Sequence, residues 1–574
     1  GGGILTLAGL QTLTGTYEDP VKIDIGTTAG INGATFTNQL TIQTNALLYV
    51  NYNQSLVISG TLTNFGTFEM FSRDVSTYLG GSGTVENRGA AVVYPVGNGG
   101  GVGQIRLQFE NAADGTLRVA TNASMGFYGN SAAISSGPID IQDGAQLSLF
   151  HDGPPHDLTL LPGSQVTGAG ALQLYGNNRL ITDGDVRVSA ALRLNDSSLA
   201  TGGGILTLAG LQTLTGTYED PVKIDIGTTA GINGATFTNQ LTIQTNALLY
   251  VNYNQSLNVN GLLTNLGIVR LFSRDASTYL GGSGVAANLG QIEVLPIGNG
   301  GGQAHVMVPV DVPPNGAVAV RSNAWLNFGA GSQLTLAGTF DIEGGAVCLV
   351  ENSAPARDLV LQSGAVISGQ GNLTFYGGNR LNVSGNATLA GVTVSFTDSS
   401  AVTGTNLLTA GSAAVITLDH SLTMPGSLTI LGTLSLANSS VVLTINNNLT
   451  LGAGGILNNP GTIEVGSYQN NGGTVNGNIP VLLGATGMVL SNLRLLPGPG
   501  PAHMVKAPPT AQAELVLDWI GPIGGRFIIE RSSDLVHWSQ VNVTVNRSTP
   551  RHFEANLGYV SPGLQFYRLR LIRN

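Results

Sequence analysis

Apolar and polar residues alternate along this chain in brief bursts that turn residues separate. Leu40 and Ile42 form one burst and Leu48 and Val50 the next, with Asn, Gly, Thr and Gln between such pairs. The same pattern returns through residues 422–465. Period-two alternation over so few residues predicts short strands with one buried side. Turn residues after each burst predict that the chain bends there.

The chain also repeats itself on a longer scale. Residues 1–56 reappear without a change as residues 202–257, an offset of 201. Beyond this identical stretch the two copies diverge but stay in register. We therefore expect one repeat unit over 1–201, a second over 202–403, and a shorter, degenerate third unit over 404–496.

A spacing of Gly-x-x-x-Asn-x-Gly occurs five times, and successive starts within one copy are 23 residues apart. A coil of about 20 to 23 residues with two or three short strands is typical of a parallel β-solenoid. Asparagine tolerates the left-handed backbone of a tight corner, and its side-chain amide can hydrogen-bond to the equivalent asparagine one turn away. The motif therefore predicts five structural turn or ladder residues: Asn64, Asn87, Asn265, Asn288 and Asn459.

The stretches 60–68 (GTLTNFGTF) and 455–463 (GILNNPGTI) resemble the rungs of bacterial autotransporter passengers and filamentous-haemagglutinin-like adhesins. The resemblance covers roughly residues 1–495. It implies an all-β, right-handed parallel β-helix, the hand that the general crossover rule also favours. It further implies a bacterial surface or secreted protein.

The last part of the chain has a different pattern. Residues 497–509 are rich in Pro and Gly and predict a semi-rigid linker. Residues 510–574 contain several alternating stretches and predict a small antiparallel β-sandwich. The run 529–538 and the closing 566–569 resemble fibronectin type III-like modules of secreted bacterial proteins, which implies a spacer or binding appendage.

Composition narrows the classes of partner. Charged residues are 10% of the 574, the net charge is −10, and only Lys22, Lys223 and Lys506 are lysines. Such a chain has no basic stripe for phosphates, so we expect no nucleic-acid partner. No apolar run reaches the roughly 18 to 20 residues of a membrane-spanning helix, so we expect no transmembrane helix. The single cysteine, Cys348, is predicted to be a buried apolar side chain.

Right-handed β-helices include polysaccharide lyases and hydrolases, and such catalysis needs paired carboxylates. The weak candidates are Asp140 with Asp143 and Asp183 with Asp185. The second copy keeps one acid of the first pair, as Asp341, and neither acid of the second pair, which favours solvated acids at corners over a catalytic site.

Candidates for a metal site are equally sparse. Calcium is the one cofactor that the sequence suggests, through the oxygen-bearing side chains Glu18, Asp19 and Asp24. The loop from His151 to His156 has two histidines, but its prolines and the loss of both histidines in the second copy favour an exposed loop over a zinc site.

The leading hypothesis is a secreted or cell-surface β-helical rod that acts as an adhesin or structural stalk without catalysis. Its expected partners are a glycan or another cell-surface ligand. The chain begins at Gly1 inside a repeat, so an open rung edge also predicts end-to-end self-association. The alternative is a polysaccharide-active lyase or hydrolase whose C-terminal module is an accessory. Aligned acids on adjacent turns would favour the enzyme.

Overall fold

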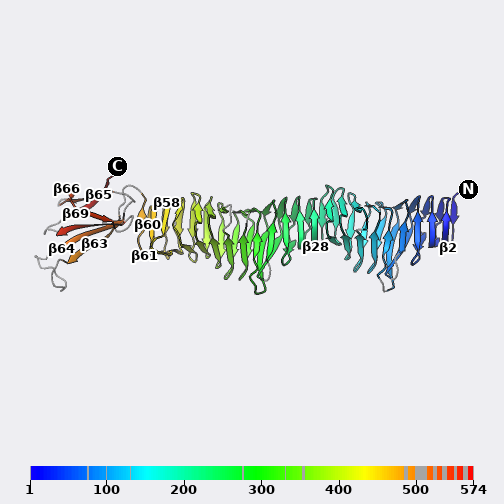
Figure 1. Ribbon diagram of the computed structural model, residues 1–574, viewed down its shortest axis with the longest axis horizontal. Coiled ribbons are helices and arrows are strands. Elements are labelled where there is room, and N and C mark those ends of the chain that lie inside the picture. The colour runs from blue at the N-terminus through cyan, green and yellow to red at the C-terminus, as the bar shows by residue number, and fades with distance from the viewer. Residues whose placement is uncertain are drawn as a thin grey trace. The chain divides into compact units, whose positions relative to one another are not determined.

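The computed structural model describes residues 2–73, 77–97, 100–129, 131–150, 152–274, 277–329, 331–351, 356–483, 489–497, 513–520, 526–532, 539–547, 552–559 and 566–572. They belong to two compact units, Gly1–Phe375 and Tyr376–Asn574. Both units contain parallel β-solenoid, about 21 turns in all, which confirms the predicted all-β fold. Figure 1 shows that within each unit the short solenoid strands lie side by side in successive turns.

Three short strands make one turn of the solenoid. In one turn these are β5 (Leu40–Ile42), β6 (Leu47–Val50) and β7 (Ser55–Ile58), after which β8 (Thr61–Asn64) pairs in parallel with β5. We call the strand stacks that contain β5, β6 and β7 faces 1, 2 and 3. Backbone hydrogen bonds therefore run between successive turns on every face.

The alternating pattern becomes a continuous core. Leu40, Ile42, Leu48 and Val50 are all fully buried, while the residues between them point outward. Burying one such side chain is worth about 1.5–3 kcal/mol. No turn could bury its apolar side alone, because the buried side chains of each turn pack against those of the turns above and below.

Corners need residues that accept a left-handed backbone. Asn45 and its equivalent Asn246 have φ of 61° and 60°. Gly81 has φ of 120°, and a Cβ there would lie 2.0 Å from the carbonyl oxygen of Ile58. Only glycine can make that close approach to the preceding turn.

The two sequence copies occupy different faces. Nine successive parallel pairings on face 1 lead from β1 (Leu5–Leu7) to β26 (Leu199–Thr201). The next strand, β27 (Leu206–Leu208), repeats the sequence of β1 but lies on face 2, between β24 (Val186–Val188) and β29 (Val222–Ile224). One repeat thus spans nine turns and about a third of a turn, so identical residues lie on neighbouring faces.

The second unit carries solenoid strands from β49 (Arg380–Val383) to β62 (Val481–Leu482), followed by a small antiparallel module. One sheet of this module has the order β63 (Val489–Pro497), β64 (Ala513–Ile520), β68 (His552–Tyr559) and β67 (Val545–Arg547). The other has the order β66 (Ser539–Val541), β65 (Arg526–Ser532) and β69 (Phe566–Ile572).

The module begins earlier than the sequence predicted. Strand β63 pairs antiparallel with β64, so the expected third solenoid unit does not continue to residue 496, and the module does not start at 510. Period-two alternation is the same in both kinds of strand, which is why the pattern alone misplaced this boundary. The expected linker at 497–509 lies, from residue 498 onward, outside the described residues.

Among the described residues there is no helix, and hence none that is long and apolar enough to cross a membrane. Cys348 is fully buried, as predicted. Burial raises the pKa of its thiol well above the usual range, so the thiol stays protonated at neutral pH.

Candidate functional site

The first pair of acid candidates lies on and after β18 (Ile139–Ile141). Asp140 points outward from face 2, where its Oδ2 lies 3.6 Å from Nε of Arg118 and accepts a hydrogen bond from Gln142 at 3.3 Å. Asp143 is exposed in the turn that follows. Its backbone carbonyl accepts a hydrogen bond from the amide of Asn122. Asp140 thus forms an ion pair with the preceding turn of the solenoid, and Asp143 is part of the bend after β18.

The second pair lies in the turn between β23 (Arg179–Thr182) and β24, two turns further on. Asp183 and Asp185 are both exposed. Asp185 accepts a hydrogen bond from the backbone amide of Ile205 at 3.0 Å and so holds the next turn in place. The two pairs are therefore separate corner features, held by different partners.

The histidine loop differs from the expectation. His156 is only 1% exposed, and its Nε2 lies 3.0 Å from Oδ1 of Asp152. Both carboxylate oxygens of Asp152 also accept from the amide of Gly129, at 3.0 and 3.1 Å. Partial burial opposes ionisation of Asp152, but the hydrogen bonds from His156 and Gly129 hold its pKa below the usual range. The prediction of an exposed loop was wrong for His156; His151 lies outside the described residues.

The calcium candidates are not gathered around a common point. Asp24 pairs with Nζ of Lys22 at 3.1 Å, and this hydrogen bond lowers the pKa of Asp24. Glu18 is exposed and Asp19 half-buried in the turn after β2 (Leu10–Tyr17). In the part of the chain that the structure describes, no group of three or more His, Cys, Asp or Glu could hold a metal ion.

The asparagines of the Gly-Asn-Gly motif form hydrogen-bonded ladders between turns. Asn64 donates to Oδ1 of Asn87 at 2.7 Å, and Asn87 donates to Oδ1 of Asn111 at 2.8 Å. Asn111 then donates to the hydroxyl of Ser135 at 3.1 Å, so the ladder continues over two residues that the sequence motif misses. All four side chains are at most 1% exposed, so each bond satisfies buried polar groups.

The same arrangement recurs in the second copy. Asn265 donates to Oδ1 of Asn288 at 2.7 Å, and Asn288 donates to the carbonyl of Ala317, also at 2.7 Å. Asn459 instead donates to the carbonyl of Asn478 at 2.7 Å. These asparagines are buried and their hydrogen bonds stabilise the corners of the solenoid.

Five side chains on face 3 stack along five successive turns, and sequence reasoning missed them. The guanidinium carbon of Arg106 lies 4.8 Å from the ring centroid of Tyr78 and 5.9 Å from that of Tyr128. The rings of Tyr128 and Phe150 are 4.6 Å apart, and those of Phe150 and Tyr175 are 5.9 Å apart. We call Tyr78, Arg106, Tyr128, Phe150 and Tyr175 the aromatic ladder.

The ladder residues lie in or directly after five paired strands of face 3. These are β10 (Thr77–Gly80), β13 (Gly103–Ile105), β16 (Ser124–Phe127), β19 (Gln146–Leu149) and β22 (Ala171–Leu174). Turns of unequal length separate these strands, so the ladder has no constant spacing in the sequence. The pairing register aligns Arg106, Tyr128, Phe150 and Tyr175, each directly after its strand, whereas Tyr78 pairs with Gln104.

The surroundings of the ladder are tightly packed on one side. Gly126 lies beneath the rings, where a Cβ would meet Phe150 at 2.6 Å and Tyr128 at 2.7 Å. Burial raises the pKa of Tyr128 to about 12, and the negative charge of Asp152 adds to this shift. The ladder side chains other than the exposed Arg106 are half-buried, so their outer edges face solvent.

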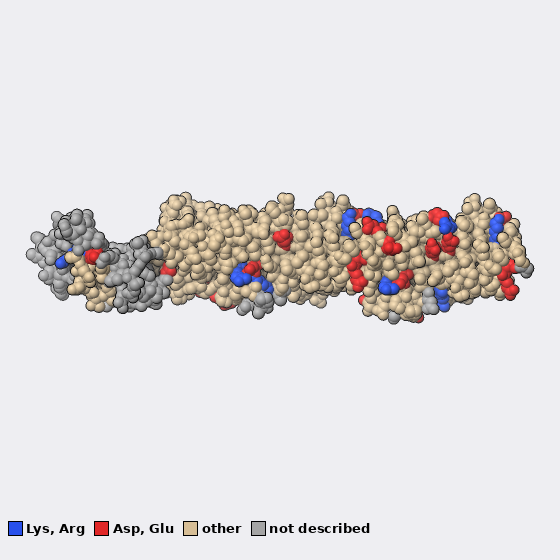
Figure 2. All heavy atoms as spheres, turned by 90° about the horizontal axis from the view of Figure 1, so that it is seen from above, with Lys and Arg blue, Asp and Glu red and all other residues tan. Residues whose placement is uncertain are grey.

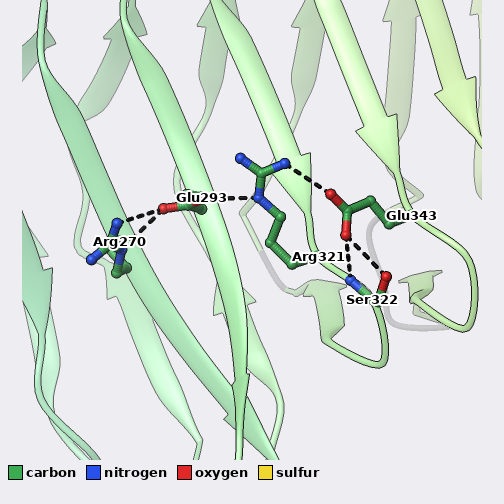
Figure 3. A network of polar contacts seen from close by, with 5 residues as sticks. All are labelled: Arg270, Glu293, Arg321, Ser322 and Glu343. Atoms are coloured by element: carbon green, nitrogen blue, oxygen red, sulfur yellow. Dashed lines mark hydrogen bonds and ion pairs between the residues drawn. The ribbon is translucent and has the colours of Figure 1, made fainter.

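A second polar feature crosses four successive turns of the second copy (Figure 3). Arg270 and Arg321 each approach Glu293 to 2.8 Å. Arg321 also binds Glu343 at 2.9 Å, and Glu343 accepts from the amide and hydroxyl of Ser322. Burial opposes ionisation of Glu293, but its two arginine partners hold its pKa below the usual range. Alternating charges thus tie neighbouring turns together.

Other charged side chains also lie close to side chains of opposite charge (Figure 2). Figure 2 shows them in small groups, mostly of both signs, with neutral side chains over most of the described surface in view.

Comparison with known proteins adds no assignment, because no family model, no curated protein and no solved structure matches this chain.

Proposed function

We propose that this protein is a secreted or cell-surface β-helical rod that acts as an adhesin or structural stalk and performs no catalysis. The observation that carries the proposal is the separation of the acid candidates. Asp140 is held by Arg118 and Gln142, while Asp185 lies two turns further on and accepts a hydrogen bond from the backbone amide of Ile205. Hydrolysis or elimination on a polysaccharide needs convergent groups around one bond, and these acids instead stabilise turns.

The resemblance of the rungs to autotransporter passengers and filamentous-haemagglutinin-like adhesins supports an extracellular location. In the same way, the resemblance of residues 529–538 and 566–569 to fibronectin type III-like modules supports an appendage role for the C-terminal module. A solenoid presents a long, repetitive surface whose stability comes from neighbouring turns, which suits reach and adhesion.

The rod and the enzyme can be separated by one panel of polysaccharides. The full chain is incubated with plant, algal and bacterial polysaccharides, and both retention and newly formed reducing or unsaturated ends are measured. We expect no new ends. Product formation that disappears in Asp140→Asn or Asp183→Asn would refute the non-catalytic rod and establish the lyase or hydrolase alternative.

Location and self-association are tested separately. Antibodies against the chain should label intact producing cells or culture medium, and exclusively intracellular signal would contradict the location. We further propose end-to-end association, because Ile4 and Leu10, beside the strand β1 that pairs with β3 (Val21–Ile23), are 68% and 81% exposed. A sharp monomer by light scattering at high concentration would contradict that association.

A further inference from the structure

The C-terminal module contains a cleft where two of its strands separate. Strand β66 pairs with β65 over only three residues, and the last pair joins Ile529 to Val541. From Asn542 onward the chain leaves β65 and enters the other sheet, where β67 pairs with β68. A cleft of about 380 Å³ lies at this point, and it is lined by Ile528, Ile529 and residues 540–545.

The first part of β65 has a free edge beside this cleft. Strand β65 pairs with β69 along all seven of its residues. On its other side, β66 reaches only residues 529–531. Among the described strands, none pairs with residues 526–528 on that side. The free edge beside the cleft is therefore three residues long, which is about 10 Å of strand.

The opposite wall of the cleft also lacks partners for its backbone. Within the described residues, Asn542, Val543 and Thr544 make no backbone hydrogen bond. Val541, Val543 and Val545 are half-buried. The residues between them, Asn542 and Thr544, are exposed, so the segment alternates as a strand does. Unpaired amide and carbonyl groups of this kind are those to which a further strand can bond.

The lining of the cleft lacks the residues that usually prevent pairing at a sheet edge. Folded proteins block such edges with charged side chains or proline. The outer strand β69 contains Arg568 and Arg570, and β63 ends at Pro497. The lining residues of the cleft are all uncharged, and none of them is a proline. This lining accepts an added strand and favours one without charge.

We propose that this cleft binds an extended, uncharged peptide segment, which adds a strand to β65 beside residues 526–528. The peptide backbone exchanges hydrogen bonds with the free edge, where β66 no longer pairs with β65. The volume of the cleft lies within the range of about 300–1,000 Å³ that is typical of ligand sites. The inference goes beyond the proposed rod, because it assigns the C-terminal module a partner of its own, a polypeptide strand.

The test uses the full chain and a capped peptide of alternating threonine and valine. Its matched control is the same peptide with alternate backbone nitrogens methylated, which removes hydrogen-bond donors and keeps the side chains. Titration calorimetry measures both affinities, and hydrogen exchange followed by mass spectrometry measures the protection of β65. We expect the unmodified peptide to protect β65 and to bind about tenfold more tightly than the methylated one, a difference of about 1.4 kcal/mol.

Two tryptophan variants separate the cleft from the rest of the module. Thr544 and Ser539 are both exposed, but only Thr544 lines the cleft. Thr544→Trp should occupy the cleft and weaken binding of the unmodified peptide about tenfold. Ser539→Trp should bind that peptide as the wild type does. If Thr544→Trp unfolds, the two peptides still test the proposal on the wild-type chain.

Three results would overturn the inference. Equal binding of the methylated and unmodified peptides would show that backbone pairing is not involved. Complete protection of residues 526–528 in the free chain would show that the edge is already covered, by a second copy of the chain if the protection rises with concentration. The absence of saturable binding of the unmodified peptide below about 1 mM would likewise overturn the site. The non-catalytic rod is tested separately, by the polysaccharide panel.

Discussion

Replacing Leu206 by alanine should destabilise the solenoid far more than the same replacement at Leu5. Both residues stand in the identical repeated sequence, so local propensity is the same for both. Leu206 lies between two neighbouring turns and is 0% exposed, whereas Leu5 pairs with one turn and is 44% exposed. The pair therefore isolates the contribution of the second neighbouring turn.

The expected magnitudes follow from burial. Leu-to-Ala replacements in closed cores cost about 2.7–5.0 kcal/mol, because the transfer term and the residual cavity add. For Leu5, with 44% of its surface already in water, about 1 kcal/mol is expected, since full burial of leucine is worth about 1.5–3 kcal/mol.

The assay is guanidinium unfolding followed by far-ultraviolet circular dichroism, with hydrogen exchange of the substituted peptide as a local readout. The substitution changes the mass of that peptide, which distinguishes it from its otherwise identical counterpart. Local exchange matters because stability in a solenoid varies from turn to turn. Equal losses for Leu206→Ala and Leu5→Ala would refute the argument that the second neighbouring turn supplies the difference.

Three further substitutions test individual contacts. Asn87→Ala removes the buried hydrogen bonds to Asn64 and Asn111 and should cost about 1–3 kcal/mol in denaturant unfolding. Asn476→Ala removes an exposed hydrogen bond to Asn458 on the neighbouring turn and should cost much less. Glu293→Gln should cost about 1–3 kcal/mol at pH 7. Because the folded pKa of Glu293 is lowered, that difference should shrink as the pH falls below about 4.3, and a constant difference in melting temperature would contradict it. Burial raises the pKa of Asp220, so its ionised form opposes folding at neutral pH. Asp220→Asn should therefore raise the melting temperature at pH 7. The increase should disappear in acid, where the wild-type carboxyl is protonated. At pH 7 the increase should be larger than that for Asp19→Asn, because Asp220 is buried and Asp19 is half-buried.

The sequence by itself determined the local features of this protein. Alternation at Leu40 and Ile42 predicted a strand with one buried side, and the turn residues around it predicted the bend. The motif at Asn64 and Asn87 marked equivalent positions on adjacent turns, which the structure joins by a hydrogen bond. These features depend on a few consecutive residues or on one constant period, so a linear pattern contains them.

Only the tertiary structure decided which residues of distant turns meet. The number of residues in a turn varies along the chain, and 201 residues do not make a whole number of turns. The repeat therefore places identical residues on different faces. Because turn lengths vary, Phe150 stacks on Tyr128 and Tyr175 although the three residues are not evenly spaced in the sequence. For Asp140 and Asp183 the sequence showed two acids of the right chemical type. Their placement on different turns was set by the strand register, which the sequence does not show. Parallel pairing between turns, which the backbone hydrogen bonds set, is the physical step that a linear pattern lacks.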